Sequence, residues 1–138
     1  MKLREVYFQD EETLFKWRKQ DEQASWWQGD SVTEDSHGRW FHQRLVSPSV
    51  HIWISEVDNI PVGQVRVDSN GEISFSVDEA QRGQGYGTEM VKFASAATSH
   101  LHGRLKANVD VANEPGLKTL LSAGYSLRKD VVFLRWPE

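Results

Sequence analysis

The chain of 138 residues contains no cysteine. This absence excludes disulfides, thiolate metal sites and a cysteine nucleophile, and it suits a reducing compartment, so we expect a cytoplasmic protein. No window approaches the roughly 18 consecutive apolar residues of a membrane-spanning helix. The length is typical of one domain, and we expect a single folded unit over residues 1–138.

An excess of positive charge is also absent, because 16 Lys and Arg stand against 20 Asp and Glu. Proteins that hold nucleic acid by neutralising its phosphates usually show a basic stripe, so we expect no nucleic-acid partner. His100 and His102 have no third ligand nearby in the sequence, and we predict no metal site. Tryptophan, in contrast, is abundant: six are present, some for a core and others to line a site.

Residues 73–88, ISFSVDEAQRGQGYGT, carry the strongest positive signal. Apolar residues alternate with small polar ones over 73–77, which predicts a strand, and the spacing of apolar residues over 88–101 predicts a helix. Three glycines on alternate positions lie between them. The first N–H groups of a helix lack partners and its dipole favours negative charge, so this order makes an anion site. With Arg82 at its rim, the segment predicts a pyrophosphate cradle.

The spacing decides which cradle it is. A Rossmann loop needs GxGxxG directly at the strand end, and a Walker loop needs GK followed by Ser or Thr, and neither is present. The pattern RxxGxG, formed by Arg82, Gly85 and Gly87, resembles the acetyl-CoA motif of the GNAT superfamily of N-acetyltransferases. Asn113 after a strand-like LKANVDV, and Ala-Gly-Tyr at 123–125, add to the resemblance.

Periodicity and turn signals predict eleven elements in an order that is also the GNAT order over essentially the whole chain. The predicted ranges are strand 3–8, helix 10–21, helix 34–45, strands 51–57, 62–68 and 73–77, helix 88–101, strand 105–111, a helix between Asn113 and Gly124, and strands 125–129 and 131–136. The resemblance implies an α/β (α+β) fold: a mixed, mostly antiparallel sheet of about seven strands with about four helices. It also implies a sheet splayed between its fourth and fifth strands, where the cofactor arm enters.

The resemblance implies acetyl-CoA as co-substrate, with its pyrophosphate on the N–H groups of Gly83 to Thr88 and its arm along the central strand. A splayed strand has free backbone groups for an amide-containing arm, and one of its N–H groups can hold the oxygen that becomes negative during attack. Asn113 contacts the arm, caps the following helix, or does both. The predicted cofactor-binding residues are Phe75, Ser76, Val77, Arg82, Gly83, Gln84, Gly85, Tyr86, Gly87, Thr88 and Asn113.

The attacking amine must be neutral, so a base or a water chain should take its proton. Glu72 is the first candidate for the catalytic base, because it shares the parity of the two serines on the central strand; a solvated charge at a strand edge is the alternative. His51 and Glu56 are weaker candidates. Many GNAT enzymes offer a tyrosine acid seven residues after the Asn, and here that position is Leu120. A thiol with a pKa of about 8.5 leaves without help, so the reaction remains feasible.

By analogy with GNAT proteins, the N-terminal third forms the acceptor side. Its Trp-Arg at 17–18, the HxxWF at 37–41 and the VGQVRVD at 62–68 resemble a subgroup that acetylates nucleotide-linked amino sugars. Tryptophan faces stack on sugars or bases, and arginines pair with a diphosphate. Trp17 and Phe41 are assigned to the core. The predicted substrate-binding residues are Arg18, Trp27, His37, Trp40 and Arg66.

Two other hypotheses stay open. An acetyltransferase of a peptide or small amine needs an acidic acceptor pocket, for which Asp21, Glu22, Asp30 or Glu34 could serve. A non-catalytic acyl-CoA-binding module is favoured by Leu120 and by the lack of a certain base. The expected partner is a small-molecule amine, with no membrane, and a homodimer stays open as the assembly.

Overall fold

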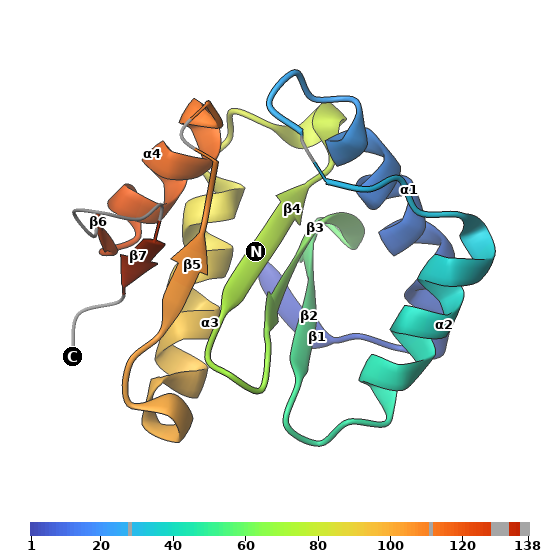
Figure 1. Cartoon of the computed structure of the whole chain (residues 1–138), viewed down its shortest axis with the longest axis horizontal. Helices are drawn as coiled ribbons and strands as arrows, with labels where there is room; N and C mark the ends of the chain where they lie inside the picture. Colours follow the sequence, from blue (N-terminus) through green and yellow to red (C-terminus); the bar gives the residue numbers. More distant parts are fainter. Residues whose placement is uncertain (28, 111, 128–132, 136–138) are drawn as a thin grey trace.

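The computed structural model describes residues 1–27, 29–110, 112–127 and 133–135 (Figure 1). The predicted order of elements is confirmed over these ranges, with two short 3-10 turns added at Phe8–Asp10 and Glu79–Gln81. The helices are α1 (Glu11–Glu22), α2 (Glu34–Leu45), α3 (Tyr86–His102) and α4 (Glu114–Ser122). The strands are β1 (Lys2–Glu5), β2 (His51–Val57), β3 (Ile60–Val67), β4 (Ile73–Val77), β5 (Lys106–Asn108), β6 (Ser126–Leu127) and β7 (Phe133–Arg135).

The strands form two sheets rather than one. An antiparallel sheet has the order β1-β2-β3-β4, and a second has the order β5-β7-β6. One parallel bridge, between Glu72 and Lys106, joins them, and the Lys106 N–H donates to the Gly71 carbonyl at 3.0 Å. Beyond that bridge β4 and β5 diverge (Figure 1). The predicted splay between the fourth and fifth strands is confirmed.

Several predicted boundaries are wrong, each for a local reason. Among the described residues of the strand predicted over 105–111, only Lys106–Asn108 form a strand, and β7 is its partner. Helix α3 begins at Tyr86 rather than Thr88, because Gly85 adopts φ 84° and ends the loop inside the glycine motif. The first strand ends at Glu5, since the Tyr7 N–H donates to Asp10 and the chain turns. Of the predicted closing hairpin, residues 128–132 and 136 lie outside the described residues.

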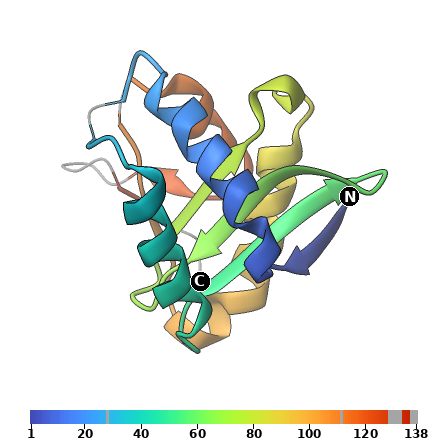
Figure 2. The ribbon, with the colours of Figure 1, turned by 90° about the vertical axis from the view of Figure 1, so that its right-hand side faces the viewer.

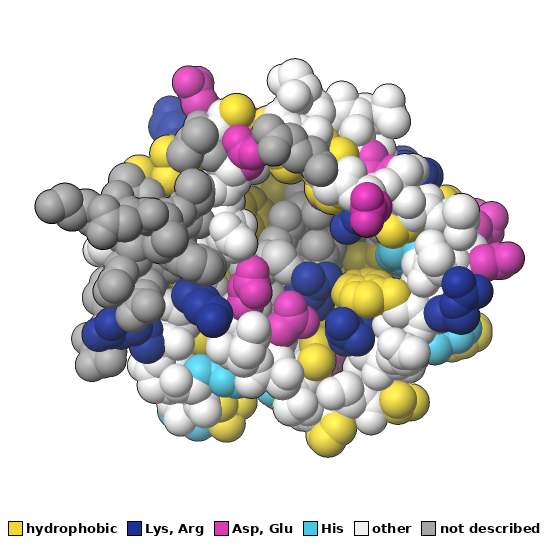
Figure 3. Space-filling view, viewed as in Figure 1, with side chains coloured by type: hydrophobic (Ala, Val, Ile, Leu, Met, Phe, Trp, Pro, Cys, Tyr) yellow, Lys and Arg dark blue, Asp and Glu magenta, His cyan; other side chains and the backbone are white. Residues whose placement is uncertain are grey.

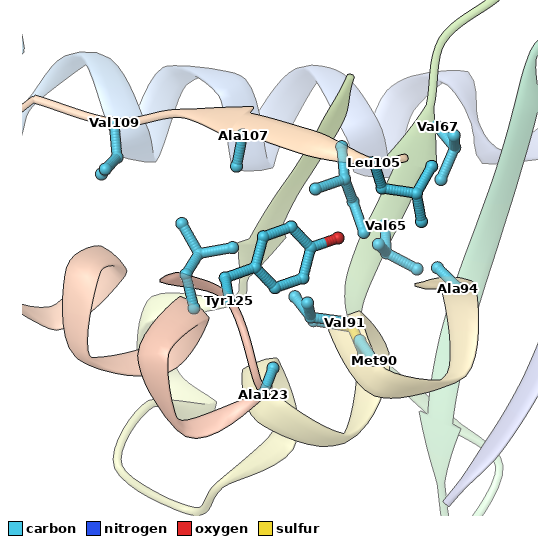
Figure 4. Close-up of a cluster of buried hydrophobic side chains, with 12 residues drawn as sticks. Val65, Val67, Met90, Val91, Ala94, Leu105, Ala107, Val109, Ala123 and Tyr125 are labelled. Atoms are coloured by element: carbon cyan, nitrogen blue, oxygen red, sulfur yellow. The ribbon is translucent and has the colours of Figure 1, made fainter. Parts of the chain in front are cut away.

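Helix α3 covers one face of the four-stranded sheet, and α1 and α2 cover the other (Figure 2). The core under α3 draws on β3, β4, β5 and the segment after α4, and it includes Val65, Met90, Leu105 and Tyr125 (Figure 4). This core joins the two sheets although their backbones part. The helices described here include none with the length and apolar composition needed to cross a membrane.

A second core fixes α1 and α2. Trp17 is 1% exposed and Phe41 is fully buried, as predicted, and both pack with Leu14 and Ile54. Thr33 begins α2 with a capping box: its side chain accepts from the Ser36 N–H at 3.1 Å, and Ser36 Oγ accepts from the Thr33 N–H at 3.0 Å. This core packs α1 and α2 against the four-stranded sheet, beside the point where β4 and β5 diverge.

Candidate active site

A cavity of about 900 Å³ lies where β4 and β5 diverge, a size usual for a small-molecule site. Figure 3 shows it as a hollow on the face of Figure 1. The cavity brings together the two predicted groups of residues. Its walls include all five predicted acceptor residues, the predicted residues of β4, Asn113, and every residue of 82–88 except Gln84.

The phosphate loop has the geometry of an anion cradle. Gly83 and Gly85 adopt φ 81° and 84°, a region that side chains disfavour, and a Cβ at either position would meet nothing within 4 Å. Gly85 is the N-cap of α3 and brings no side chain, so the first N–H groups of this 17-residue helix are left for a ligand. The cradle is open and oriented toward negative charge.

Gly87 serves a different purpose from its neighbours. A Cβ there would lie 3.2 Å from Thr119 Cγ2 and 3.4 Å from Phe75 Cε2. Its lack of a side chain lets the first turn of α3 pack against both α4 and β4. This glycine keeps the elements around the cradle close together, a packing role that the motif alone did not reveal.

The edge of β4 facing the cavity suits an amide-containing arm. Its other edge pairs with β3 throughout, from Gly63 opposite Val77 to Val67 opposite Ile73, whereas past the Glu72 bridge the cavity edge has no strand partner among the described residues. The Ser74 Oγ, which also lines the cavity, is buried without a hydrogen-bond partner in the described part of the chain. Buried polar groups require partners, so these residues fit acetyl-CoA.

Asn113 has a defined structural role. Its Oδ1 accepts from the Gly116 N–H at 3.1 Å, which caps α4 as predicted. A Cβ at Gly116 would lie 2.5 Å from Asn113 Nδ2, so the glycine makes room for the cap. The Asn113 side chain also lines the cavity. Its contact with the cofactor stays a prediction.

The part of the cavity wall predicted to hold the acceptor, called the acceptor wall below, consists of Arg18, Trp27, His37, Trp40 and Arg66. In it each arginine lies over a tryptophan. The Arg66 guanidinium lies 4.9 Å from the centre of the Trp40 ring, and that of Arg18 lies 4.5 Å from the centre of Trp27. Each arginine also meets one carboxylate: Arg66 Nε lies 3.1 Å from Asp68, and Arg18 Nε lies 3.1 Å from Glu22. Burial lowers the pKa of Arg66, and the charge of Asp68 opposes that shift.

His37 is part of this wall and is only 6% exposed. Its ring lies 5.5 Å from that of Trp40, and its Nδ1 has no hydrogen-bond partner within the described ranges. Burial, with the charge of Arg18, lowers the pKa of His37, so the imidazole is neutral at pH 7. This Nδ1 is itself buried, so His37 contributes its ring face to the cavity wall and leaves a buried ring nitrogen unpaired among the described residues.

Glu72 lies at the bridge to Lys106, the point from which β4 and β5 diverge. It is not among the residues that line the cavity, although its charge is near enough to favour the charged form of Arg66. His51 stacks on Trp53, and Glu56 lies 3.3 Å from Arg4 Nε; neither lines the cavity. The catalytic role of Glu72 stays a prediction.

Asp21 is the acidic residue whose position the sequence argument undervalued. Its carboxylate lines the cavity, accepts from Ser76 Oγ at 2.6 Å and lies 3.4 Å from an Arg82 nitrogen. Burial raises its pKa. The available signal was helical spacing, because Leu14, Trp17 and Asp21 recur at three and four residues and so share the inward face of α1.

Glu22, the next residue along α1, has a structural role. It accepts from Lys19 Nζ at 2.9 Å and from Ser31 Oγ and the Val32 N–H at 3.0 Å. It thereby anchors the segment between α1 and α2.

No three His, Asp or Glu side chains gather as a metal site within the ranges described.

Comparison with known proteins agrees with this geometry. Residues 1–126 match the family model of the acetyltransferase (GNAT) domain. Among curated proteins no match is found. The aminoglycoside acetyltransferase AAC(6')-Ib, solved with paromomycin and acetyl-CoA, is 18% identical with a TM-score of 0.80, and the match covers 99% of this chain and 92% of that one.

A second similar structure is the spermidine N-acetyltransferase SpeG from Vibrio cholerae in complex with CoA and spermine. It is 10% identical with a TM-score of 0.78, and the match covers 97% of this chain and 92% of that one. At such identities the likeness shows the fold, and the family model shows the kinship. The chain belongs to the GNAT family, and it is an N-acetyltransferase whose co-substrate is acetyl-CoA.

Proposed function

We propose that this enzyme acetylates a primary amine on an acceptor that also carries an anionic, nucleotide-like part, as a nucleotide-linked amino sugar does. The observation that supports the proposal is the pair of arginine–tryptophan contacts on the acceptor wall, Arg66 with Trp40 and Arg18 with Trp27. Indole faces stack on bases and sugar rings, and guanidinium groups bind phosphate oxygens in pairs.

The charge of the cavity wall supports the same acceptor class. Arg18, Arg66, Arg82 and Lys118 line it, against the two carboxylates of Asp21 and Asp110. Paromomycin and spermine, found with the two similar structures, carry several amines, which a wall rich in arginine disfavours. An acceptor with a diphosphate would instead gain charge-assisted hydrogen bonds here.

The chain supplies positioning and polarisation. Acetyl-CoA, when bound, supplies an acetyl thioester that a neutral amine can attack. The loop N–H groups and Arg82 hold the pyrophosphate, and an N–H among Phe75 to Val77 stabilises the oxygen that gains charge. Leu120 stands where many relatives have a tyrosine acid and is 2% exposed, so the thiolate leaves without a side-chain acid from that position.

The test is release of free CoA from acetyl-CoA, followed with a thiol reagent. Since the chain has no cysteine, no protein thiol contributes to the signal. The panel pairs amino sugars linked to a nucleoside diphosphate with the same sugars unlinked, and adds spermidine and a lysine peptide. We expect kcat/KM for the linked sugars to exceed that for the unlinked ones by about 10- to 100-fold, from one or two charge-assisted contacts. A preference for spermidine or the peptide would overturn the proposed acceptor class.

A further inference from the structure

Side chains of α1 contact the segment that runs from β4 into the phosphate loop. Gln20 Oε1 accepts from the Glu79 N–H at 3.0 Å, and Lys16 Nζ lies 3.7 Å from Asp78. Asp21, at the centre of this contact, accepts from Ser76 Oγ at 2.6 Å and lies 3.4 Å from Arg82. Helix α1, which carries the acceptor residue Arg18, is therefore in direct contact with Arg82 of the loop that binds the cofactor.

Arg82 contacts both its own loop and helix α1. Its Nε donates to the Val77 carbonyl at 3.1 Å, and its NH2 group meets Asp21 at 3.4 Å, longer than the 2.7–2.9 Å typical of a charge-assisted bond. Its side chain is 48% exposed, so it can turn toward the loop. A pyrophosphate beside the helix N-terminus is the stronger anion, since it carries more charge than one carboxylate.

We propose that Asp21 receives the amine of the acceptor, and that Arg82 neutralises Asp21 only until the pyrophosphate of acetyl-CoA draws Arg82 away. This inference rests on the proposed acetyl transfer. Once Arg82 leaves, the half-buried carboxylate keeps Ser76 as its hydrogen-bond partner; the charge of Arg18, at longer range, favours its charged form, and that of Glu22 opposes it. A buried charge without a close counterion is unfavourable. The ammonium group of the acceptor is the missing counterion. Acetyl-CoA and the amine therefore each make the other bind more tightly.

The position of Asp21 suits proton transfer. It lies over β4 at Ser76, beside the strand edge that holds the arm. Asp21 takes one proton from the ammonium and passes it to solvent, and the freed nitrogen pair forms the bond to the acetyl carbon. The carbon–sulfur bond breaks with its electrons to sulfur. The second proton lost by the nitrogen reaches that sulfur through solvent, so amide, thiol and one released proton account for all atoms.

The other carboxylates of this region are placed for different tasks. Asp110, which also lines the cavity, has its Oδ1 bound to the Ala112 N–H at 2.8 Å. Glu72 lies outside the cavity lining, at the bridge. Asp21 is the cavity carboxylate that contacts both β4 and the cofactor loop.

The experiment is a double-mutant cycle with CoA itself as the probe, measured by calorimetry. Wild type, Asp21→Asn, Arg82→Gln and the double variant are compared, with Asp110→Asn as the matched loss of one cavity carboxylate. Circular dichroism checks that each variant is folded. We expect Asp21→Asn to tighten CoA binding about fivefold, because Arg82 no longer leaves a partner, and to have an effect under about twofold in the Arg82→Gln background.

Two results would overturn the exchange of partners. In one, Asp21→Asn tightens CoA binding equally in both backgrounds or no more than Asp110→Asn does, which would indicate simple repulsion. In the other, it leaves CoA affinity unchanged. Since CoA is the probe, the cycle gives an answer even if no nucleotide-linked amine is acetylated, so the failure of the proposed acceptor is separable.

Turnover tests the second half of the inference with whichever amine the panel identifies. Asp21→Asn should lower kcat about 100-fold and remove the acid limb of the pH profile, without raising the KM for acetyl-CoA. An unchanged pH profile in this variant would show that Asp21 does not take the proton.

Discussion

The two halves of the cavity are built from different parts of the chain. The cofactor half uses backbone: the N–H groups at the start of α3, the free edge of β4, and glycines at 83 and 85 with positive φ. The acceptor half uses side chains of α1, α2, β3 and the segment between the two helices, with arginines lying over tryptophans. Backbone geometry suits a co-substrate that never changes, and side chains suit an acceptor that distinguishes one family member from another.

The largest effect should come from breaking the backbone half. Gly85→Val places a β-branched residue at φ 84°, which it cannot adopt, so the cap of α3 must change shape. We expect CoA to bind about 100-fold more weakly, as the loss of two or more N–H contacts implies. Calorimetry with CoA measures this. The control is Gly85→Asn, since Asn tolerates this φ, and equal losses in the two variants would argue against the backbone as the cause.

Removing Arg66 from the side-chain half should change only the binding of the acceptor. Arg66→Gln removes the guanidinium that lies over Trp40, and we expect the KM for a nucleotide-linked acceptor to rise about 30-fold with the KM for acetyl-CoA unchanged. Steady-state kinetics with each substrate varied in turn gives both values. Arg66→Lys is the matched variant; it keeps the charge but not the fork, and it should recover only part of the loss. A rise in the KM for acetyl-CoA would instead show that Arg66 also contributes to binding of the cofactor.

The pH dependence of stability should reveal how the acceptor half is anchored. Burial alone would raise the pKa of Glu22, but hydrogen bonds from Lys19, the Val32 N–H, Arg18 and Ser31 lower it to about 2 from 4.5. The folded pKa is depressed, so this stabilisation is present above pH 4.5 and is lost as pH falls toward 2. Between pH 5 and pH 3 the Tm of wild type should fall more than that of Glu22→Gln. Parallel curves would mean that Glu22 titrates normally.

The smallest expected effect is on the capping box of α2. Thr33→Ala removes the oxygen that accepts from the Ser36 N–H and should cost about 1 kcal/mol of unfolding free energy. Urea denaturation measures the change, and Thr33→Ser, which keeps the oxygen, is the control. CoA affinity should not respond, because α2 lies in the acceptor half. A weaker affinity for CoA would show that the halves are coupled through α2 as well.

The same contrast explains what the sequence could predict. The order of elements and the cradle depend on neighbours along the chain, so alternation over 73–77 and the glycines after Arg82 were sufficient. The start of α3 was misplaced by two residues, because a glycine in the left-handed region can serve as N-cap within the motif. The predicted strand 105–111 was too long, since the pattern gives apolar alternation but not the length over which a partner strand is present.

Contacts between distant residues were the harder part. The bond between Asp21 and Ser76 joins residues 55 positions apart, and no local pattern specifies it. Resemblance to a family drew attention to Arg66 and Trp40, but their stacking became visible only in the structure. The packing role of Gly87 likewise depends on Thr119, which lies on another helix.

The bridge between Glu72 and Lys106 has a mechanical consequence. Among the described residues it is the point at which backbone joins the two sheets, so the angle at which β4 and β5 diverge depends on the side chains packed beneath them. These side chains come from α3, β5 and the segment after α4, and among them is Tyr125, whose hydroxyl lies 2.8 Å from Ser95 Oγ. Tyr125 and Ser95 do not line the cavity, so the width of the slot for the arm of acetyl-CoA depends in part on residues outside that slot.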